Sequence, residues 1–289
     1  MTFENKQSIL AENLKQFNKR LSLAKRQKEI TVTELARLYC EAFDDTDDVL
    51  SVLSLIGNEL SASEEIIFLS ELCRSPLSSK LKDILFIGSS EPTSAGAHSK
   101  ISYLKNKYND MAFDYFSRSV SNAKPDYASS FTECCENVFD GRCEFCILPI
   151  MNSSDGRLMS FYSLLDRYEL KICEIIDIDN DSAPSTLRYA RVGRASSEPK
   201  KRTPKTHNYI FEFSIVSEDT DFFAPLFEAA ATIEAKLTCI DSLPIEYASN
   251  VQKFFLSFAI PQQNALAFRL FVSLKHPSYT PIGLYKETI

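Results

Sequence analysis

The spacing of apolar residues changes near residue 80 and separates a helical part of the chain from an α/β part. Over residues 1–80 the apolar positions recur with a period near 3.6, with Lys and Glu on the opposite face, which is typical of amphipathic helices. The first of these positions are Ile9, Leu14, Phe17, Leu21 and Leu23. We therefore predict an N-terminal domain built only of helices.

Capping residues predict where several of these helices begin. Thr33 is placed to cap a helix, and Ser61 or Ser63 to cap another, because their hydroxyl groups can accept a free backbone N–H. The predicted helices cover residues 34–43, 48–60 and 64–73. Pro76 and the serines around it then predict a joint at the end of the domain.

From residue 82 short apolar runs alternate with helical segments, which is the pattern of an α/β unit. The predicted strands cover residues 84–87, 144–150 and 170–178, and the predicted helices residues 99–108, 131–140 and 158–168. Gly88 closes the first strand, and Gly141 is a good helix stop. Continuous apolar strands of this kind belong to a sheet that is covered on both faces.

The last third of the chain predicts a second sheet after a basic connector. Residues 188–205 are rich in Lys and Arg and contain Ser and Pro, which favours a linker. Strands are predicted over residues 209–216, 235–242, 253–259 and 279–284, and helices over residues 225–232 and 262–274. This β-α-β-β-α-β order is ferredoxin-like. The sequence thus predicts an α+β protein with a helical domain (1–80), an α/β lobe (81–195), a linker (196–206) and a ferredoxin-like module (207–289).

Composition limits the classes of function. The 289 residues carry a net charge of −7 and a sequence pI near 5.2, which argues against wholesale binding of nucleic acid or membranes. No run is long and apolar enough for a membrane span, and the N-terminus lacks the layout of a signal peptide. Eight cysteines without such a signal indicate reduced thiols, so we expect a cytoplasmic protein.

One polar turn carries candidate chemistry. The apolar strand that begins near Cys146 runs into Asn152-Ser-Ser-Asp-Gly156, directly before a predicted helix. A turn at the carboxyl end of an α/β strand is where open sheets place ligands. Asn152, Ser153 and Gly156 are therefore candidate ligand-binding residues, although the same pattern also fits a simple capping turn.

The segment Pro149-Ile-Met-Asn-Ser-Ser-Asp-Gly156 resembles the Pro-Ile-Glu-Asn-Ser/Thr-x-x-Gly motif of prephenate dehydratases, with Met151 in place of the glutamate. Thr186-Leu-Arg-Tyr189 resembles the late Thr-Arg-Phe strand of that family. The resemblance implies that Arg188 could pair with a substrate carboxylate and that a threonine helps the hydroxyl group to leave. Leu187 holds the family's threonine position, however, and Thr186 lies one residue earlier, which on a strand places its side chain on the opposite face.

The family places a whole second lobe between these two motifs, whereas here Thr186 follows Asp179 after only a few residues. The resemblance therefore implies a truncated lobe, one half of a cleft of the periplasmic-binding-protein type. A site with one wall stays wet, and water weakens the electrostatic contacts that catalysis needs. We do not expect dehydratase activity.

The module carries a second resemblance. Leu237-Thr-Cys-Ile-Asp-Ser-Leu-Pro244 is similar to the Leu-Thr-Lys-Ile-Glu-Ser-Arg-Pro signature of the ACT regulatory domain that follows prephenate dehydratases. It implies a homodimer formed through the module and a phenylalanine effector site that includes Asp241 and Ser242. The family's Gly-Ala-Leu signature is replaced by Phe223-Ala-Pro-Leu226. The order of modules is that of bifunctional chorismate mutase–prephenate dehydratases.

Three functional hypotheses follow. The first is a catalytically impaired relative of the phenylalanine pathway enzyme that binds a small anionic or amino-acid ligand, or a protein partner. The second is an active prephenate dehydratase or chorismate mutase whose site is completed across a dimer. The third is an amino-acid-responsive DNA-binding regulator, because residues 23–36 resemble a helix-turn-helix motif: a basic helix, a threonine-capped turn and a second helix. The acidic residues 44–48 would repel DNA, however, so nucleic acid binding is not expected.

A metal site is not expected. Cys143 and Cys146 form a Cys-x-x-Cys pair, but no second such pair supports it, and residues three apart on a straight strand point to opposite faces. His98, His207 and His276 are too scattered for a ligand set or a triad. We therefore predict buried reduced thiols, and no metal or cofactor.

Overall fold

The computed structural model describes residues 3–42, 53, 56–78, 81, 99–179, 184–194, 208–245 and 250–286. The chain divides into two compact units. The first contains the N-terminal residues up to Leu81 together with Phe222–Ile233 and Leu266–Lys275. The second contains Lys82–Asp221, Glu234–Ala265 and His276–Ile289. The predicted strand over residues 84–87 lies outside the described residues.

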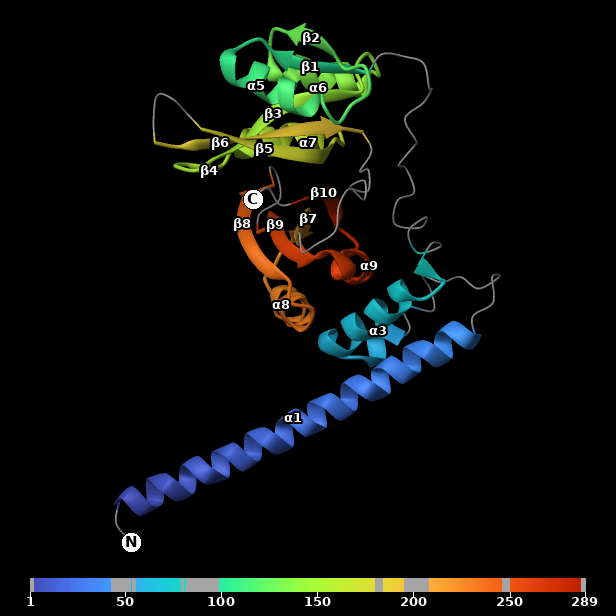
Figure 1. Cartoon of the computed structure of the whole chain (residues 1–289), viewed down its shortest axis with the longest axis vertical. Helices are drawn as coiled ribbons and strands as arrows, with labels where there is room; N and C mark the ends of the chain where they lie inside the picture. Colours follow the sequence, from blue (N-terminus) through green and yellow to red (C-terminus); the bar gives the residue numbers. More distant parts are fainter. Residues whose placement is uncertain are drawn as a thin grey trace. The chain divides into compact units, whose positions relative to one another are not determined.

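The first unit is made of helices α1 (Phe3–Ala42), α3 (Ala62–Arg74), α8 (Phe223–Thr232) and most of α9 (Ala265–Lys275). The C-terminal part of α1 packs along α3, as Figure 1 shows, with Val32 and Ala36 buried and the ring edge of Tyr39 against Phe68. Ser61 begins α3 with a capping box, in which its side chain and that of Glu64 satisfy each other's backbone N–H groups. This confirms one of the two predicted caps.

The prediction of a separate helix capped by Thr33 is wrong. Helix α1 runs without a break from Phe3 to Ala42, and the helix-turn-helix interpretation of residues 23–36 fails with it. The segment contains no Gly or Pro that would stop the helix. In the same turn the hydroxyl group of Thr31 donates to the carbonyl oxygen of Gln27 at 3.0 Å, which shows that a threonine here is accommodated within the helix. Of the predicted helix over residues 48–60, residues 56–59 are helical and most of the rest lie outside the described residues.

The second unit is built around one ten-stranded mixed sheet with the order β2-β1-β3-β6-β5-β10-β7-β9-β8, and β4 pairs with β3 beside this path. Its strands are β1 (Lys100–Leu104), β2 (Lys124–Ala128), β3 (Phe145–Asn152), β4 (Gly156–Arg157), β5 (Lys171–Asp179), β6 (Thr186–Gly193), β7 (Asn208–Ser217), β8 (Lys236–Pro244), β9 (Gln252–Pro261) and β10 (Thr280–Lys286). The helices of this unit are α5 (Lys107–Phe116), α6 (Phe131–Phe139) and α7 (Met159–Arg167), with a short 3₁₀ turn at Gln262–Asn264. We call β1–β6 with α5–α7 the lobe, and β7–β10 the module sheet.

Two predictions in the lobe need correction. The predicted helix over residues 99–108 is strand β1, followed by α5, which is capped by Asn106. Ile101, Ser102 and Tyr103 are all buried, because β1 is covered on both faces, and the buried hydroxyl group of Ser102 accepts from Asn137. The residues from Arg188 to Gly193 were predicted to belong to the linker but form part of β6.

The module sheet confirms the predicted β-α-β-β-α-β order of elements, and its strands lie in the order β10-β7-β9-β8. It is continuous with the lobe, because β10 pairs in parallel with β5 through Gly283 and Ile172. A Cβ atom at Gly283 would lie 2.9 Å from the carbonyl oxygen of Ile172 and 2.9 Å from its Cβ atom. Glycine is therefore required where these two strands meet.

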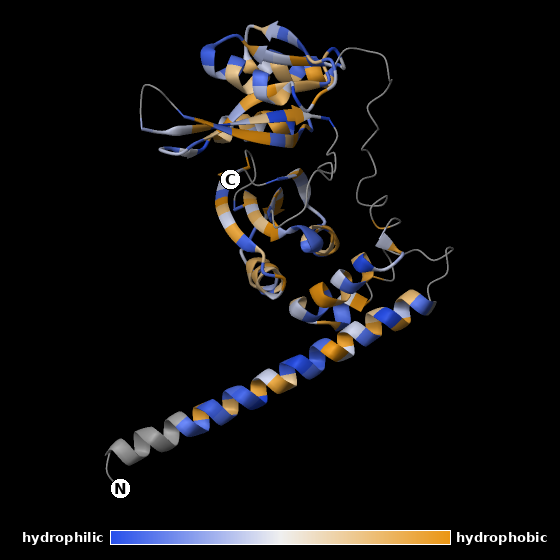
Figure 2. Ribbon diagram, in the orientation of Figure 1, coloured by the Kyte–Doolittle hydropathy of each residue, from blue (hydrophilic) through white to orange (hydrophobic). Residues whose placement is uncertain are grey.

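A single hydrophobic cluster spans this junction. Tyr162, Leu165 and Ile172 of the lobe pack in one cluster with Ile210, Phe255, Ile282 and Tyr285 of the module sheet. Figure 2 shows hydrophobic residues recurring along the strands of the lobe and of the module sheet. The described part of the chain has no helix long and apolar enough to cross a membrane.

Candidate functional site

The predicted ligand turn is held by its own side chains. Asn152 ends β3; its Oδ1 accepts from the backbone N–H of Ser154 at 3.1 Å, and its Nδ2 donates to Asp155 Oδ2 at 2.6 Å. Gly156 has a φ of +80°, in the left-handed region that favours glycine, and returns the chain as β4 alongside Asn152. The amide of Asn152 thus shapes a turn between β3 and β4, and the prediction of a cap for the following helix is wrong, because the N-cap residue of α7 is Leu158 and α7 has no side-chain cap.

Ser153 and Thr186 are brought together across the ends of β3 and β6. The backbone N–H of Thr186 donates to Ser153 Oγ at 2.8 Å, and the N–H of Ser153 donates to the carbonyl oxygen of Thr186 at 2.9 Å. The hydroxyl group of Thr186 donates to Asp179 Oδ1 at 3.2 Å. The two polar segments that were predicted from separate motifs therefore form one cluster at the edge of the lobe.

Arg188 belongs to the same strand, but its guanidinium group is held by Asp177. Nε and Nη2 donate to the two carboxylate oxygens at 2.7 Å and 2.8 Å, a bidentate pair that raises the pKa of Arg188. Both side chains are about one-third exposed. The pairing of β5 with β6 is regular from Arg188 to Thr186, so no bulge moves Thr186 into the position that Leu187 occupies.

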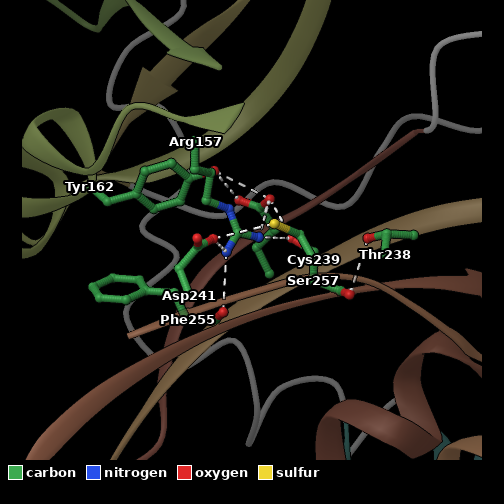
Figure 3. Close-up of polar contacts among 8 residues, drawn as sticks. Arg157, Tyr162, Thr238, Cys239, Asp241, Phe255 and Ser257 are labelled. Carbon is green, nitrogen blue, oxygen red and sulfur yellow. Dashed lines mark hydrogen bonds and ion pairs between the residues drawn. The ribbon is translucent and has the colours of Figure 1, made fainter. Parts of the chain in front are cut away.

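Arg157 directly follows the turn and connects it to the module sheet. Its Nη1 donates to Asp241 Oδ2 at 2.9 Å and to the carbonyl oxygen of Phe255 at 3.1 Å. Its Nη2 donates to Glu212 Oε1 at 3.3 Å and to Ser257 Oγ. The guanidinium group, drawn in Figure 3, is therefore surrounded by acceptors from three strands of the module sheet.

Glu212 is the buried counter-ion of this cluster. Its side chain is 6% exposed and that of Arg157 is 2% exposed. Tyr162 OH donates to Glu212 Oε2 at 3.0 Å, and Ser257 Oγ donates to Oε1 at 2.5 Å. Burial alone would lower the pKa of Arg157, but Glu212 and the neighbouring groups raise it above its usual value. Burial and then Glu212 raise the pKa of Tyr162, so this hydroxyl group stays a donor.

The two predicted effector residues lie in different environments. Asp241 is one-third exposed and accepts from Arg157 and, at 3.2 Å, from the thiol of Cys239. Ser242 is exposed on β8. Arg157 is thus a direct link between the predicted ligand turn and the predicted effector segment, which are 84 residues apart in sequence.

Sequence reasoning missed both Arg157 and Glu212. The signal was Glu212, a charged residue in the middle of the apolar run over residues 209–216. A carboxylate inside a buried strand requires a partner. What the sequence could not supply is which cation provides it, because Arg157 lies 55 residues away.

Cys143 and Cys146, the Cys-x-x-Cys pair, are buried thiols. In the part of the chain that the structure describes, no group of three His, Cys, Asp or Glu side chains could hold a metal ion. Cys143 and Cys146 are buried, and burial raises the pKa of Cys143 to about 12 and that of Cys146 well above its usual value. These thiols stay protonated at neutral pH and are poor nucleophiles.

Comparison with solved structures identifies the architecture. The prephenate dehydratase of Streptococcus mutans matches with a TM-score of 0.53 at 18% identity, over 65% of this chain and 98% of that chain. The prephenate dehydratase of Arthrobacter aurescens in complex with L-Phe matches with a TM-score of 0.50 at 12% identity, over 65% and 90% of the two chains. The chain has a prephenate-dehydratase-like fold.

The same fold also carries another described activity. GqqA, described as a novel type of quorum quenching acylase, matches with a TM-score of 0.50 at 18% identity, over 65% of this chain and 95% of that chain. No protein-family model matches the sequence, and no curated protein matches it. At these identities the likeness shows the fold alone, so function has to be argued from the site.

In this prephenate-dehydratase-like fold the candidate residues form two groups. Asn152, Ser153, Thr186 and Arg188 lie around the ends of β3 and β6 and are paired with one another or with aspartates. Asp241 belongs to the second group with Arg157 and Glu212 at the junction with the module sheet. Arg157 joins the second group to the turn of the first.

Proposed function

We propose that the protein is a catalytically impaired relative of prephenate dehydratase that binds a small anionic or amino-acid ligand and acts as a regulatory or partner protein. The observation that carries this proposal is the bidentate pair between Arg188 and Asp177. An arginine that binds a substrate carboxylate must present its two parallel N–H groups to the substrate. Here Asp177 occupies both, so a substrate carboxylate would have to compete with a carboxylate that is already in place.

The connection between β5 and β6 supports the same proposal. Asp179, the last residue of β5, pairs with Thr186, the first residue of β6, so the two strands form a close antiparallel hairpin. A second lobe would have to be inserted at this point to close a cleft over Ser153 and Thr186. With one wall, water reaches the reacting groups and weakens each charge interaction.

The module supports a regulatory role and a homodimer. Among the described strands β8 lies at an edge of the sheet and exposes Leu237 and Ile240, which makes it a suitable surface for pairing with a second module. A ligand that binds Asp241 and Ser242 would contact the acceptor of Arg157, and through Arg157 it would act on the turn. L-Phe is the first candidate ligand, because a neighbour with this fold is described in complex with it.

The first experiment measures turnover of freshly prepared prephenate by the full chain, with phenylpyruvate followed in the presence and absence of L-Phe. We expect no product, even at high protein concentration. Product formation that is abolished by Arg188→Ala would contradict the proposal and support the alternative, an active enzyme whose site is completed across a dimer. Product that survives Arg188→Ala would point to a contaminant.

The second experiment tests binding directly. Isothermal titration with L-Phe and with prephenate is compared for the wild type and for Asp177→Asn, which removes the carboxylate that holds Arg188. We expect Asp177→Asn to strengthen prephenate binding and to leave L-Phe binding unchanged, because the two sites are different. Arg157→Lys should reduce the change in hydrogen exchange of the turn at residues 152–156 that L-Phe produces, because Arg157 connects Asp241 to this turn. If neither L-Phe nor prephenate binds, small anionic and amino-acid ligands are ruled out and only the role as a partner protein remains.

A further inference from the structure

We propose that the exposed apolar seam of α1 is the interface with a second copy of this chain, formed by antiparallel pairing of the two α1 helices. Leu14, Phe17 and Leu21 are exposed, and so are Leu35 and Leu38 further along the helix. Together with Ala24, Lys28 and Thr31 these residues are spaced alternately by three and four, which is the heptad pattern of a coiled-coil seam. Figure 2 shows hydrophobic bands interrupting the mainly hydrophilic ribbon of α1.

The length of the unsupported helix calls for a partner. Every described side chain from residue 12 to residue 28 is exposed, and α1 buries side chains against α3 only further along, at Val32 and Ala36. An isolated helix of about 15 residues is marginal in water, and most helical stability in proteins comes from packing of an apolar face. The first half of α1 presents such a face, and within the described residues of its own unit nothing covers it.

Charge favours a second copy in the antiparallel direction. Residues 12–28 of α1 carry six basic side chains and one acidic side chain, Glu12, whereas residues 29–42 carry three glutamates and one arginine. The basic side chains of the first stretch are Lys15, Lys19, Arg20, Lys25, Arg26 and Lys28, and the glutamates of the second are Glu29, Glu34 and Glu41. Antiparallel pairing places the basic stretch of each helix beside the glutamate-containing stretch of the partner helix.

The seam matches itself in this direction. Antiparallel packing of the heptads pairs Leu14 with Leu38 and Phe17 with Leu35 of the other copy, and places Arg20 beside Glu34. Lys28 then faces Ala24, and its ammonium group can keep its contact with Glu64 of α3, which lies 3.0 Å away. Parallel pairing would instead bring Lys28 against Lys28 inside the seam, which like-charge repulsion disfavours.

The test is the mass of the full chain in solution, measured by light scattering and sedimentation equilibrium over a range of concentrations. Phe17→Glu with Leu21→Glu should weaken dimerisation by at least about a hundred-fold, because four apolar side chains per dimer lose their contacts. Leu23→Glu is the matched control: Leu23 is 59% exposed and Leu21 58% exposed on the same helix, but Leu23 lies off the seam. Circular dichroism verifies that each variant keeps its helices.

A charge exchange identifies the partner and the direction. Arg20→Glu should weaken the dimer, and Arg20→Glu combined with Glu34→Arg should restore it. Within one chain these residues are 14 positions apart, or roughly 21 Å along the helix, so they cannot rescue each other in a monomer. Each α1 variant is also made together with Ile240→Glu, which places a charge on the edge strand β8, so that association through the module does not mask the α1 interface.

Several outcomes would overturn the proposal. A monomer at high concentration, or a dimer of the Ile240→Glu protein that Phe17→Glu with Leu21→Glu leaves intact, would show that α1 is not the interface. Failure of the charge exchange to restore the dimer would refute the antiparallel arrangement. A monomer that sediments with vesicles rich in phosphatidylserine would mean that the basic half of α1 binds an anionic membrane instead.

Discussion

Removal of the positive charge of Arg157 should be the most costly single change at the junction between the lobe and the module sheet. In Arg157→Met the carboxylate of Glu212, 6% exposed in the wild type, loses its cation. Breaking a buried ion pair from one side costs about 3–5 kcal/mol. Two donors remain, Tyr162 OH at 3.0 Å and Ser257 Oγ at 2.5 Å, and Asp241 is exposed enough to rehydrate. We therefore expect Arg157→Met to lower the free energy of unfolding by about 3 kcal/mol, the lower end of this range.

The measurement is urea unfolding at pH 7 of four proteins: the wild type, Arg157→Met, Glu212→Gln and the double variant. Glu212→Gln keeps an acceptor for Tyr162 and Ser257 but removes the charge, so the double variant should recover about 2 kcal/mol relative to Arg157→Met. Arg142→Met is the control, because Arg142 and its partner Asp140 are 60% and 49% exposed, and such a pair contributes about 0–1 kcal/mol. A loss below about 1 kcal/mol for Arg157→Met, or a double variant as unstable as Arg157→Met, would refute the reasoning.

Three further predictions concern other sites. Gly283→Ala should destabilise the protein by about 1–3 kcal/mol and speed hydrogen exchange in β10 and β5, because the added methyl group meets the backbone of Ile172 at 2.9 Å. Ser61→Ala should cost about 0.5–2 kcal/mol at pH 7. Hydrogen bonds from Ser61, and then Lys28, lower the pKa of Glu64 to about 2, so the part of this loss that comes from the Ser61 hydroxyl donating to the Glu64 carboxylate is present above pH 4.5 and disappears as the pH falls towards 2. The hydrogen bond from the Glu64 backbone N–H to Ser61 Oγ does not titrate, so the melting curves of the two proteins should move closer together in that window without coinciding. Burial raises the pKa of Glu65, which Lys275 opposes from 2.8 Å, so Lys275→Met should destabilise the protein more at pH 8 than at pH 4, where Glu65 is protonated.

The sequence predicted local structure best where the period of apolar residues was clear. The order of elements in the module was confirmed because β7 and β9 are mainly apolar runs, and the predicted helices between the strands show the period of a helix. Residues 99–108 were misread because a strand of five residues, Lys100–Leu104, is too short to show a period. The Thr33 cap failed because capping residues are also tolerated inside a long helix whose interior has no Gly or Pro.

The candidate site could be predicted only in part. Asn152, Ser153 and Thr186 lie near one another, as local motifs at strand ends suggested. The sequence could not predict that the guanidinium group of Arg188 is paired with Asp177, because this pair depends on the register between β5 and β6. Arg157 was missed for a similar reason: its partners come from β7, β8 and β9, and only the joining of β10 to β5 places those strands beside the turn.

The continuous sheet narrows the places where a partner can add a strand. On the described path β5 pairs with β6 on one side and β10 on the other, so the path ends only at β2 and β8. Lys124 and Pro125 lie next to each other in the five-residue β2 and discourage pairing at that edge, whereas in β8 Lys236 and Pro244 stand at the two ends and the strand between them exposes Leu237 and Ile240. Association at β8 would rest on backbone hydrogen bonds and apolar contacts, and association at α1 on an apolar seam with ion pairs beside it. Salt should therefore weaken the α1 interface more than the β8 interface, which allows the two to be separated in one titration of the wild-type protein.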